Sequence, residues 1–511
     1  MEPSKAKICV PVCAGTNELG HSIARAAEVG DLIELRLDCL PEDKREQAWR
    51  ELVANTSRPI VLTLRPSEQG GNANVSLRNR LQFWSSIQNV RERVMFDLEL
   101  DVITDALANK ALDPSAVICS HHQFEGGIAN LESMYARMAA QPAAVLKIAV
   151  WADDAIDCLP IFKLLERAQQ EGRELIAIAM GQAGIMTRIL GPSRGSFLTF
   201  GSLGDEAATA PGQLSARELR ELYRIDRINR QTEIMGLIGR PVAHSLSPNI
   251  HNSAFAESDA NAVFIPFEVQ DVDAFLRRMV RKSSREMDWN LRGLSVTAPH
   301  KASVMKHLDW IQPAAKEIGA VNTIVVQDDG LHGYNTDAPA FIETLSGKVD
   351  QVEKLRCAVI GAGGAARAVV WALKQAGASI TLFVRDPVKA RSIGDDFQVV
   401  IRQLAQANFR DVDVVVNATP LGTLGAQESD APVEAEQLRE VRLAYDLVYN
   451  PLETRFMREA KAAGCETVGG LEMLIAQAVE QFKLWTGTNP NIVVMRAAAE
   501  KALGRLALHD S

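Results

Sequence analysis

The sequence lacks a long hydrophobic run, a secretory leader and an excess of positive charge. No stretch of about twenty consecutive apolar residues occurs, which is the length that a helix needs to cross a bilayer. The first residues, MEPSKAK, hold no apolar core of a signal peptide. The formal net charge is −9, which disfavours nucleic acid or an anionic membrane as the main partner. We therefore expect a cytoplasmic protein that binds small molecules.

The sequence also lacks a C-x-x-C pair of cysteines. It has seven cysteines, an odd number, and no C-x-x-C motif, which favours reduced thiols in a cytosol. Cys9 and Cys13 fall in one apolar run and are interpreted as core residues rather than ligands. We expect no metal site.

Alternating apolar and helix-periodic segments fill the first half. The chain has 511 residues, enough for about three domains, and its 47% hydrophobic content allows several cores. Eight short apolar runs lie at residues 8–13, 32–37, 60–64, 94–98, 116–120, 145–150, 175–180 and 197–200. Eight regular units favour a closed (β/α)8 barrel over residues 1–230, with a doubly wound sheet as the alternative.

Polar residues lie within or just after these runs, where a barrel carries its chemistry. Glu34 and Arg36 are two apart, so they project to the same side of their strand. Arg65 follows the third run, and His121 and His122 follow the fifth. The pattern predicts a site at the C-terminal ends of the strands.

Lys147 lies inside the apolar stretch AVLKIAV. A buried ammonium group is costly, so burial favours the neutral amine, the form that attacks a ketone. The alternative is a lysine that is paired with an inward-facing carboxylate. These residues alone leave both interpretations open.

Motifs across residues 7–228 resemble type I 3-dehydroquinate dehydratase. They are ELRLD at 34–38, TLR at 63–65, SHHQF around His122, LKIAV at Lys147 and APGQ at 210–213, in that family's order. The resemblance implies that Lys147 forms a Schiff base with the substrate ketone, while His122, rather than His121, serves as general base and acid. It also implies that the substrate's carboxylate and hydroxyls are bound by Glu34, Arg36, Arg65, Arg188, Thr209 and Gln213.

The first half departs from this family at two positions. Gln69 stands where the family commonly has Glu, and an amide cannot exchange protons, so any role of that acid in assisting His122 is in doubt. Glu68 is adjacent, although its side chain starts in another direction. Thr209 stands where the family usually has Ser and keeps the hydroxyl.

A glycine fingerprint opens the last third of the chain. In RCAVIGAGGAARAVVWALKQAG an apolar strand turns through Gly361-x-Gly363-x-x-Ala366 into an alanine-rich helix. Gly361 permits the tight turn, and Gly363 lets backbone amides approach a pyrophosphate at the helix N-terminus. In this strand–turn–helix setting the motif predicts a Rossmann dinucleotide site.

The next apolar run, 380–384, ends in Arg385 and Asp386. An NAD site usually has an acid here to hold the ribose, whereas Arg385 could bind the 2′-phosphate of NADP. The alternative is a solvated Arg–Asp turn. NADP is favoured, and Asp386 brings a negative charge near the phosphate.

The second half carries motifs that resemble shikimate dehydrogenase from about residue 234 to 500. A charged segment at 214–229 precedes them and is predicted to be an amphipathic helix. The pair Ser247–Pro248 predicts a helix start, with Ser247 as N-cap and proline at N1. The motifs are the two-serine loop at Ser245 and Ser247, SVT-x-P-x-K at 295–301, AVNT at 320–323, G-x-NTD at 333–337, NATP at 417–420, D-x-x-YNP at 446–451 and GGLEMLIAQA at 469–478.

This second resemblance implies reduction of 3-dehydroshikimate to shikimate with NADPH. It implies that Lys301 and Asp337 act at the reacting carbonyl. The substrate pocket would comprise Ser245, Ser247, Thr297, Asn322, Tyr449 and Gln477. The cofactor would be held by Gly361, Ala362, Gly363, Gly364, Ala365, Arg385, Thr419, Leu447 and Gly470.

Because the product of the first site is the substrate of the second, we expect a bifunctional α/β enzyme. The expected domains are a barrel at 1–230, a substrate-binding domain at 231–345 completed by 470–511, and a Rossmann domain at 346–469. Its small-molecule ligands would be 3-dehydroquinate, 3-dehydroshikimate, shikimate and NADP. One alternative is a catabolic quinate or shikimate dehydrogenase that uses NAD, and another is a non-catalytic sensor.

Overall fold

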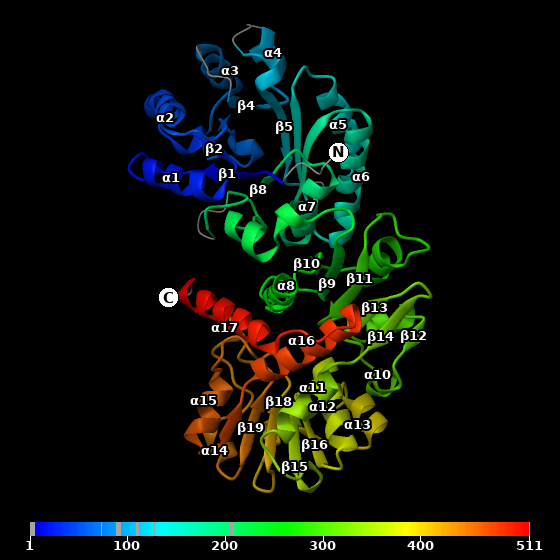
Figure 1. Ribbon diagram of the computed structural model, residues 1–511. Helices are drawn as coiled ribbons and strands as arrows, with labels where there is room; N and C mark the ends of the chain where they lie inside the picture. Colours follow the sequence, from blue (N-terminus) through cyan, green and yellow to red (C-terminus); the bar gives the residue numbers. More distant parts are fainter. Residues whose placement is uncertain are drawn as a thin grey trace. The chain divides into compact units, whose positions relative to one another are not determined.

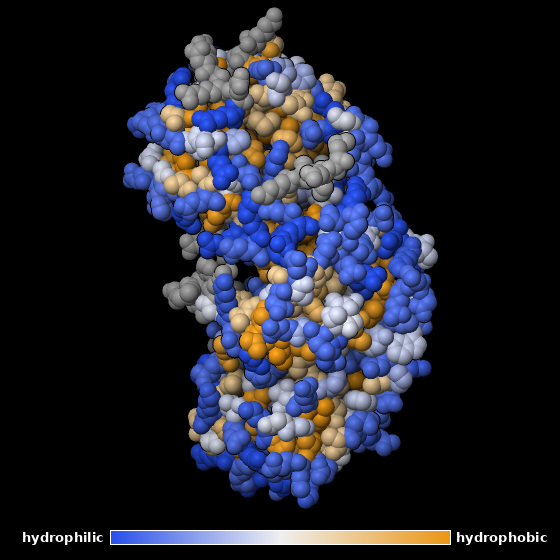
Figure 2. All heavy atoms as spheres, viewed as in Figure 1, coloured by the Kyte–Doolittle hydropathy of each residue, from blue (hydrophilic) through white to orange (hydrophobic). Residues whose placement is uncertain are grey.

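The computed structural model describes residues 6–72, 74–87, 93–108, 112–125, 128–204 and 209–509, with side chains to residue 504. The first five residues, where no signal peptide was expected, lie outside this set. The chain divides into two compact units, one of residues 1–234, 241–243 and 261–290 and the other of residues 235–240, 244–260 and 291–511. On the face drawn in Figure 2, hydrophilic side chains cover much of each unit. Within the described residues, no helix combines the length and the apolar character needed to cross a membrane.

The first unit contains a parallel barrel of eight strands (Figure 1). The strands are β1 (Ile8–Val12), β2 (Leu32–Arg36), β3 (Ile60–Thr63), β4 (Val94–Glu99), β5 (Val117–Gln123), β6 (Val145–Trp151), β7 (Glu174–Met180) and β8 (Thr199–Phe200). They follow the order β7-β6-β5-β4-β3-β2-β1-β8, and a parallel bridge from Leu175 to Ser196 brings the two edges together. The barrel predicted from the sequence is confirmed.

Helices cover the outside of the barrel: α1 (Leu19–Val29), α2 (Glu42–Asn55), α3 (Leu77–Ser86), α4 (Ile103–Ala108), α5 (Leu131–Ala139), α6 (Leu159–Gln170) and α7 (Ile185–Leu190). The single helix predicted for residues 214–229 is wrong. The structure has a π-helical turn, Glu218–Leu222, and a short 3-10 helix, Ile225–Arg227. Arg224 between them has a φ of 49°, a left-handed conformation that a continuous α-helix excludes.

The first unit also includes β10 (Ala262–Glu268), α9 (Val272–Phe275) and a π-helical turn, Leu276–Val280. Asp154 joins this segment to the barrel, because its Oδ2 accepts the backbone N–H groups of Gln270 at 2.9 Å and Asp271 at 2.8 Å. Lys163 forms an ion pair with Glu286 at 2.5 Å. The segment is thus tied to the barrel by polar contacts.

The second unit begins with a mixed sheet. Its strands β9 (Glu233–Gly239), β11 (Leu291–Val296), β13 (Thr323–Val326), β14 (Leu331–Tyr334) and β12 (Trp310–Ile311) follow in that order. Its helices are α8 (Ser247–Glu257), α10 (Pro313–Ile318), α11 (Asp337–Ser346), α16 (Gly470–Thr486) and α17 (Ile492–His509). Helix α17 contacts α8, and α16 contacts α11, so the C-terminal residues pack on the start of this unit.

A doubly wound parallel sheet completes the second unit. Its strands are β15 (Arg356–Ile360), β16 (Ser379–Val384), β17 (Val400–Gln403), β18 (Val414–Asn417), β19 (Leu443–Asp446) and β20 (Glu466–Val468), flanked by α12 (Gly364–Gln375), α13 (Arg391–Phe397), α14 (Ala435–Leu438) and α15 (Arg455–Ala462). The order β17-β16-β15-β18-β19-β20 is the Rossmann order. Cys357 and Val359 belong to one apolar core, and Ala358 and Ile360 to another, so both faces are covered. The predicted Rossmann fold is confirmed.

Candidate active sites

The inward-facing residues of the barrel form layers, because alternate residues of a strand share one face. The layer near the start of the strands is apolar and includes Cys9, Leu32, Val61, Ile118, Val145 and Ile176. Two residues further along the same strands come Glu34, Thr63, Ser120 and Lys147, and two further come Arg36, Arg65 and His122. Polarity therefore increases toward the C-terminal ends of the strands.

A cavity opens at this end of the barrel. It holds about 530 Å³, part of it open to solvent, which suits a small organic acid. All the residues that the sequence assigned to the first site line it: Glu34, Arg36, Arg65, His122, Lys147, Arg188, Thr209 and Gln213. His121, one residue from His122 on β5, does not, because neighbouring residues of a strand face opposite ways.

Lys147 projects from β6 into this cavity, and its side chain is only 6% exposed. Its Nζ donates to Asp97 Oδ2 at 2.9 Å and lies 3.5 Å from Glu34 Oε1. It also lies 4.2 Å from the centre of the Phe200 ring. Lys147 is buried and paired with the inward carboxylate of Asp97, which is the arrangement of the alternative interpretation.

The charge of Asp97 is fixed by its neighbours. Burial alone would raise its pKa, but the positive charges of Arg65 and Lys147 hold the pKa well below its usual range. Arg65 Nη2 lies 2.8 Å from Asp97 Oδ1. Asp97 is therefore a permanent anion beside the amine of Lys147.

His122 has the character of a base. Burial lowers its pKa well below the usual value, and the charges of Arg65 and Lys147 add to the effect, so the imidazole is neutral. Its backbone N–H donates to Gln69 Oε1 at 3.1 Å. In the described part of the chain, the buried Nδ1 of His122 has no hydrogen-bond partner. A neutral, unpaired imidazole in a cavity can accept a proton from a bound molecule.

Gln69 therefore holds the backbone of His122 and lines the cavity. Glu68 is exposed and is not among the lining residues, so it does not replace the missing acid.

Arg188 supplies an uncompensated positive charge. It lies on α7, is 2% exposed and lines the cavity. Burial lowers its pKa to about 10, and no carboxylate of the described residues offsets the loss of water. Its Nε is buried and has no partner among the described residues. An anion in the cavity, such as a substrate carboxylate, would satisfy it.

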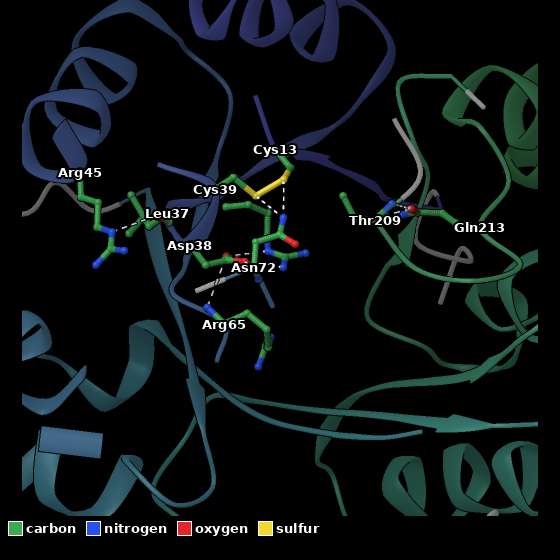
Figure 3. Close-up of a disulfide and its surroundings, with 10 residues drawn as sticks. Cys13, Leu37, Asp38, Cys39, Arg45, Arg65, Asn72, Thr209 and Gln213 are labelled. Carbon is green, nitrogen blue, oxygen red and sulfur yellow. Dashed lines mark hydrogen bonds and ion pairs between the residues drawn. A yellow bond between two sulfur atoms is a disulfide. The ribbon is translucent and has the colours of Figure 1, made fainter. Parts of the chain in front are cut away.

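A disulfide joins Cys13 after β1 to Cys39 at the end of the 3-10 turn Leu37–Cys39 (Figure 3). Asn72 Nδ2 lies 3.3 Å from the sulfur of Cys13 and 3.2 Å from that of Cys39. The backbone N–H of Asn72 donates to Asp38, which also accepts from Arg36 Nη2 at 2.7 Å. The disulfide thus adjoins the residues that hold Arg36.

The expectation of reduced thiols is wrong for this pair. Strand β1 ends at Val12, so Cys13 lies beyond the apolar run, where it is exposed rather than part of the core. The other five cysteines are free and buried: Cys9, Cys119, Cys158, Cys357 and Cys465.

Sequence reasoning missed the buried acids of β4 and the aromatic ring beneath Lys147. Asp97 and Glu99 are both 0% exposed, and Phe200 lies at the end of β8. The run VMFDLELD carries three acids at intervals of two residues, so Asp97 and Glu99 project to the same side of their strand, as Glu34 and Arg36 do. That signal could have identified Asp97 and Glu99.

A second polar cluster lies in the second unit. Lys301 Nζ donates to Asp337 Oδ2 at 2.6 Å, and Asn322 Nδ2 donates to Asp337 Oδ1 at 2.8 Å. Asp337 begins α11 and Asn322 directly precedes β13, so two elements hold the carboxylate. Lys301 is 19% exposed, which leaves its ammonium group accessible to a ligand.

The other predicted substrate residues belong to several elements of the second unit. Ser245 Oγ accepts the backbone N–H of Ser247 and donates to Ser247 Oγ, both at 3.2 Å. A hydrogen bond with Ser245 lowers the pKa of Tyr449, although burial has the larger effect and raises it. Thr297 follows β11, and Gln477 lies on α16. The predicted N-cap is off by one residue, since Ser247 is the first residue of α8 and Leu246 precedes it.

The glycine turn has the geometry that a pyrophosphate needs. Gly361 has a φ of 121°, and a Cβ there would lie 2.8 Å from the carbonyl oxygen of Ala418, so only glycine fits. Gly363 precedes α12, and a Cβ there would meet nothing within 4 Å, which leaves free space at the helix N-terminus. A Cβ on Gly364 would lie 3.1 Å from Lys301 Cδ, so the turn adjoins the lysine.

The other predicted cofactor residues follow the ends of parallel strands. Arg385 and Asp386 follow β16 and are exposed. Asp386 Oδ1 accepts backbone N–H groups from Val388 at 3.0 Å and Lys389 at 3.4 Å, so its charge is engaged in its own turn. Three more predicted residues lie after β18, after β19 and at the start of α16: Thr419, Leu447 and Gly470. The residues present therefore fit a dinucleotide with a 2′-phosphate.

Three family models match the chain. Type I 3-dehydroquinase matches residues 8–230, the shikimate dehydrogenase substrate binding domain matches 237–324, and the shikimate 5′-dehydrogenase C-terminal domain matches 470–500.

The similar proteins agree with these matches. The bifunctional 3-dehydroquinate dehydratase/shikimate dehydrogenase, chloroplastic, of Arabidopsis thaliana is 32% identical over 94% of this chain and 82% of its own length. A shikimate dehydrogenase (NADP(+)) of Methanocaldococcus jannaschii is 38% identical over 53% of this chain and 97% of its own. The shikimate 5-dehydrogenase structure of Thermus thermophilus with NADP(H) and shikimate is 38% identical over 53% of this chain and 99% of its own, with a TM-score of 0.46. The chain therefore belongs to the family of bifunctional 3-dehydroquinate dehydratase/shikimate dehydrogenases.

Proposed function

We propose that this enzyme converts 3-dehydroquinate to shikimate in two steps. The barrel removes water to give 3-dehydroshikimate, and the second unit reduces that ketone with NADPH. The observation that carries the proposal is the cavity shared by the buried amine of Lys147, the unpaired imidazole of His122 and the uncompensated guanidinium of Arg188. A lysine, a base and an anion-binding group are what an imine-forming dehydratase requires.

In the barrel, Lys147 attacks the substrate ketone, and the addition product loses water to form a protonated Schiff base. His122 removes a proton from the adjacent carbon, and the electron pair flows toward the iminium nitrogen to give an enamine. The enamine then expels the hydroxyl group, which leaves as water with the proton from His122. Hydrolysis of the imine restores Lys147, so one water is lost overall.

The anion of Asp97 supports this chemistry at Lys147. It lies 2.9 Å from Nζ, so it stabilises a cationic iminium formed on that nitrogen. Arg188, Arg36 and Arg65 would bind the substrate's carboxylate and hydroxyls, with Glu34, Thr209 and Gln213 as further hydrogen-bonding partners.

In the second unit, Lys301 donates a proton to the oxygen of the ketone as it becomes an alkoxide. Asp337, 2.6 Å from Nζ, holds the amine of Lys301 in position. The nicotinamide cofactor supplies the hydride when it is bound. Substrate binding would fall to Ser245, Ser247, Thr297, Asn322, Tyr449 and Gln477.

NADP is the cofactor of the shikimate dehydrogenase relatives, and the residues of this chain suit it. The turn from Gly361 through Ala365 would hold the pyrophosphate, and Arg385 would bind the 2′-phosphate. Thr419, Leu447 and Gly470 would line the nicotinamide half. The domain limits proposed are 1–230, 231–345 with 470–511, and 346–469.

The alternatives receive less support. A catabolic dehydrogenase that uses NAD was suggested by Asp386, but this carboxylate accepts two backbone N–H groups of its own turn. A non-catalytic sensor would not need Lys147, His122, Lys301 and Asp337 together. A cytoplasmic location stays a prediction, and the Cys13–Cys39 disulfide weighs against a reducing compartment.

Borohydride trapping tests the first step. Reduction in the presence of 3-dehydroquinate should leave a stable adduct on Lys147 alone, as found by mass spectrometry of peptides. A Lys147→Met chain should take up no adduct and should retain NADPH-dependent reduction of 3-dehydroshikimate. Unmodified wild-type protein with full dehydratase activity would contradict the imine mechanism.

A further inference from the structure

The barrel also has ionisable residues that do not line the cavity. Asp97 and Glu99 lie two residues apart on β4 and project to the same side. Glu99 is not among the residues that line the cavity, and its side chain is 0% exposed. A fully buried carboxylate away from the substrate needs another reason for its position.

Glu99 is held between two arginines. Its Oε1 accepts a hydrogen bond from Arg65 Nη1 at 2.8 Å, and its Oε2 accepts one from Arg80 Nη1 at 3.0 Å. Arg80 lies on α3 and is 5% exposed. Its Nη2 continues the row to Asp101 at 2.7 Å, whose side chain is 48% exposed. Charges alternate along the row, from the surface to the cavity.

Arg65 is the member of this row that reaches the cavity. Nη1 donates to Glu99 and to Ser120 Oγ, both at 2.8 Å, while Nη2 lies 2.8 Å from Asp97 Oδ1. Glu99 and Asp97 thus hold one guanidinium plane from two sides. The second oxygen of Asp97 stays on Lys147 at 2.9 Å.

We propose that Glu99, supported by Arg80, is a positioning residue for dehydration: it fixes the guanidinium of Arg65 against the substrate and keeps one oxygen of Asp97 free for Lys147. Without the charge of Glu99, Arg65 can turn toward Asp97 and take both of its oxygens, since a guanidinium binds a carboxylate best through two parallel hydrogen bonds. Lys147 then loses its hydrogen bond to Asp97. This inference rests on the proposed dehydratase function.

The pH dependence follows from the groups that face Glu99. Burial raises the pKa of Glu99 to about 7, the charge of Arg65 opposes the rise, Asp97 adds to it and Arg80 opposes it. Arg65 follows β3, Arg80 lies on α3 and Asp97 shares β4, so these are the charged side chains in contact with the carboxylate or beside it. As pH falls below this value, Glu99 takes up a proton and its hold on Arg65 weakens.

Glu99→Gln tests the role, because glutamine keeps the size of the side chain and removes its charge. We expect kcat/KM for dehydration to fall about 10- to 100-fold, the range for loss of a hydrogen bond between charged groups, with much of the change in KM. The decline of wild-type kcat/KM below about pH 7 should disappear in the variant. Reduction of 3-dehydroshikimate by the same chain should be unchanged.

Asp154→Asn is the matched control, since Asp154 is also a buried carboxylate of the first unit but binds backbone amides away from the cavity. It should lower the thermal stability and leave kcat/KM and its pH profile as in the wild type. If Glu99→Gln does not fold, Arg80→Gln serves instead and should reduce kcat/KM about tenfold.

The proposal is overturned if the folded variant keeps kcat/KM within about twofold of the wild type, or if it loses only stability and keeps the wild-type pH profile. Absence of dehydratase activity in the wild-type chain would instead overturn the proposed function.

Discussion

At the scale of single residues, the buried carboxylate of Asp97 sets the electrostatics of the barrel cavity. It contacts Arg65 at 2.8 Å, Lys147 at 2.9 Å and the hydroxyl of Ser120. Each partner favours the ionised form, and together they outweigh the cost of burial. Two cations in the cavity therefore share this anion.

Asp97→Asn should destabilise the barrel by about 3 kcal/mol at neutral pH, because it removes an anion that two buried cations share. The pKa of Asp97 is lower in the folded chain than in the unfolded chain. Its contribution to stability is therefore present above the unfolded pKa, about 4, and is lost as pH falls through the folded value.

Urea unfolding at a series of pH values measures both effects. The difference in unfolding free energy between wild type and Asp97→Asn should narrow as the pH falls below about 4. A difference that stays constant down to about pH 2 would show that the charge of Asp97 is not the cause.

The role of Lys147 as a site residue could be predicted from the sequence, but its partner Asp97 was not predicted. A lysine inside AVLKIAV is conspicuous because apolar residues surround it on both sides. Asp97 stands in a run with further acids, Glu99 and Asp101, which reads equally well as a solvated strand end. That it lies against Lys147, 50 residues away, follows only from the parallel pairing of β4, β5 and β6.

At the scale of elements, the eight strands were predictable because each is a short apolar run between helical segments. The disulfide that joins the end of β1 to the turn after β2 could not be predicted in this way. Cys13 and Cys39 are 26 residues apart in the sequence, and neighbouring parallel strands bring their Cα atoms to 5.4 Å. The prediction of a single helix at residues 214–229 was wrong for a local reason, because the backbone of Arg224 is left-handed.

Reduction of the Cys13–Cys39 disulfide should lower the unfolding free energy of the barrel by about 3 kcal/mol, since it frees a loop of this length in the unfolded chain. Urea unfolding with and without a thiol reductant measures the change. A Cys39→Ser chain should show the lower value in both buffers. Equal stability of the wild type in both buffers would mean that the two sulfurs are not bonded in solution.

At the scale of the whole molecule, each unit contains the reactive groups proposed for one of the two steps. Lys147 and His122 lie in the first unit, and Lys301, Asp337 and the glycine turn lie in the second. The link between them is therefore chemical, since the ketone released by one is the ketone reduced by the other.

An equimolar mixture of a Lys147→Met chain and a Lys301→Met chain should convert 3-dehydroquinate to shikimate, although neither chain does so alone. Lys301→Met should lower NADPH oxidation about 100- to 10,000-fold, the usual contribution of a proton donor, and leave dehydration intact. NADPH absorbance after addition of 3-dehydroquinate follows the reaction and should fall after a lag. A mixture without turnover, with both single activities present, would contradict independent sites.

The hydrogen bonds of Asp154 have a consequence for attempts to divide this fusion. A gene cut between the halves, near residue 230, would leave the amides of Gln270 and Asp271 without the carboxylate that now caps them. The severed reductase would have to hydrate those amides. Scission would thus remove the hydrogen-bond acceptor that these two backbone amides have in the intact polypeptide.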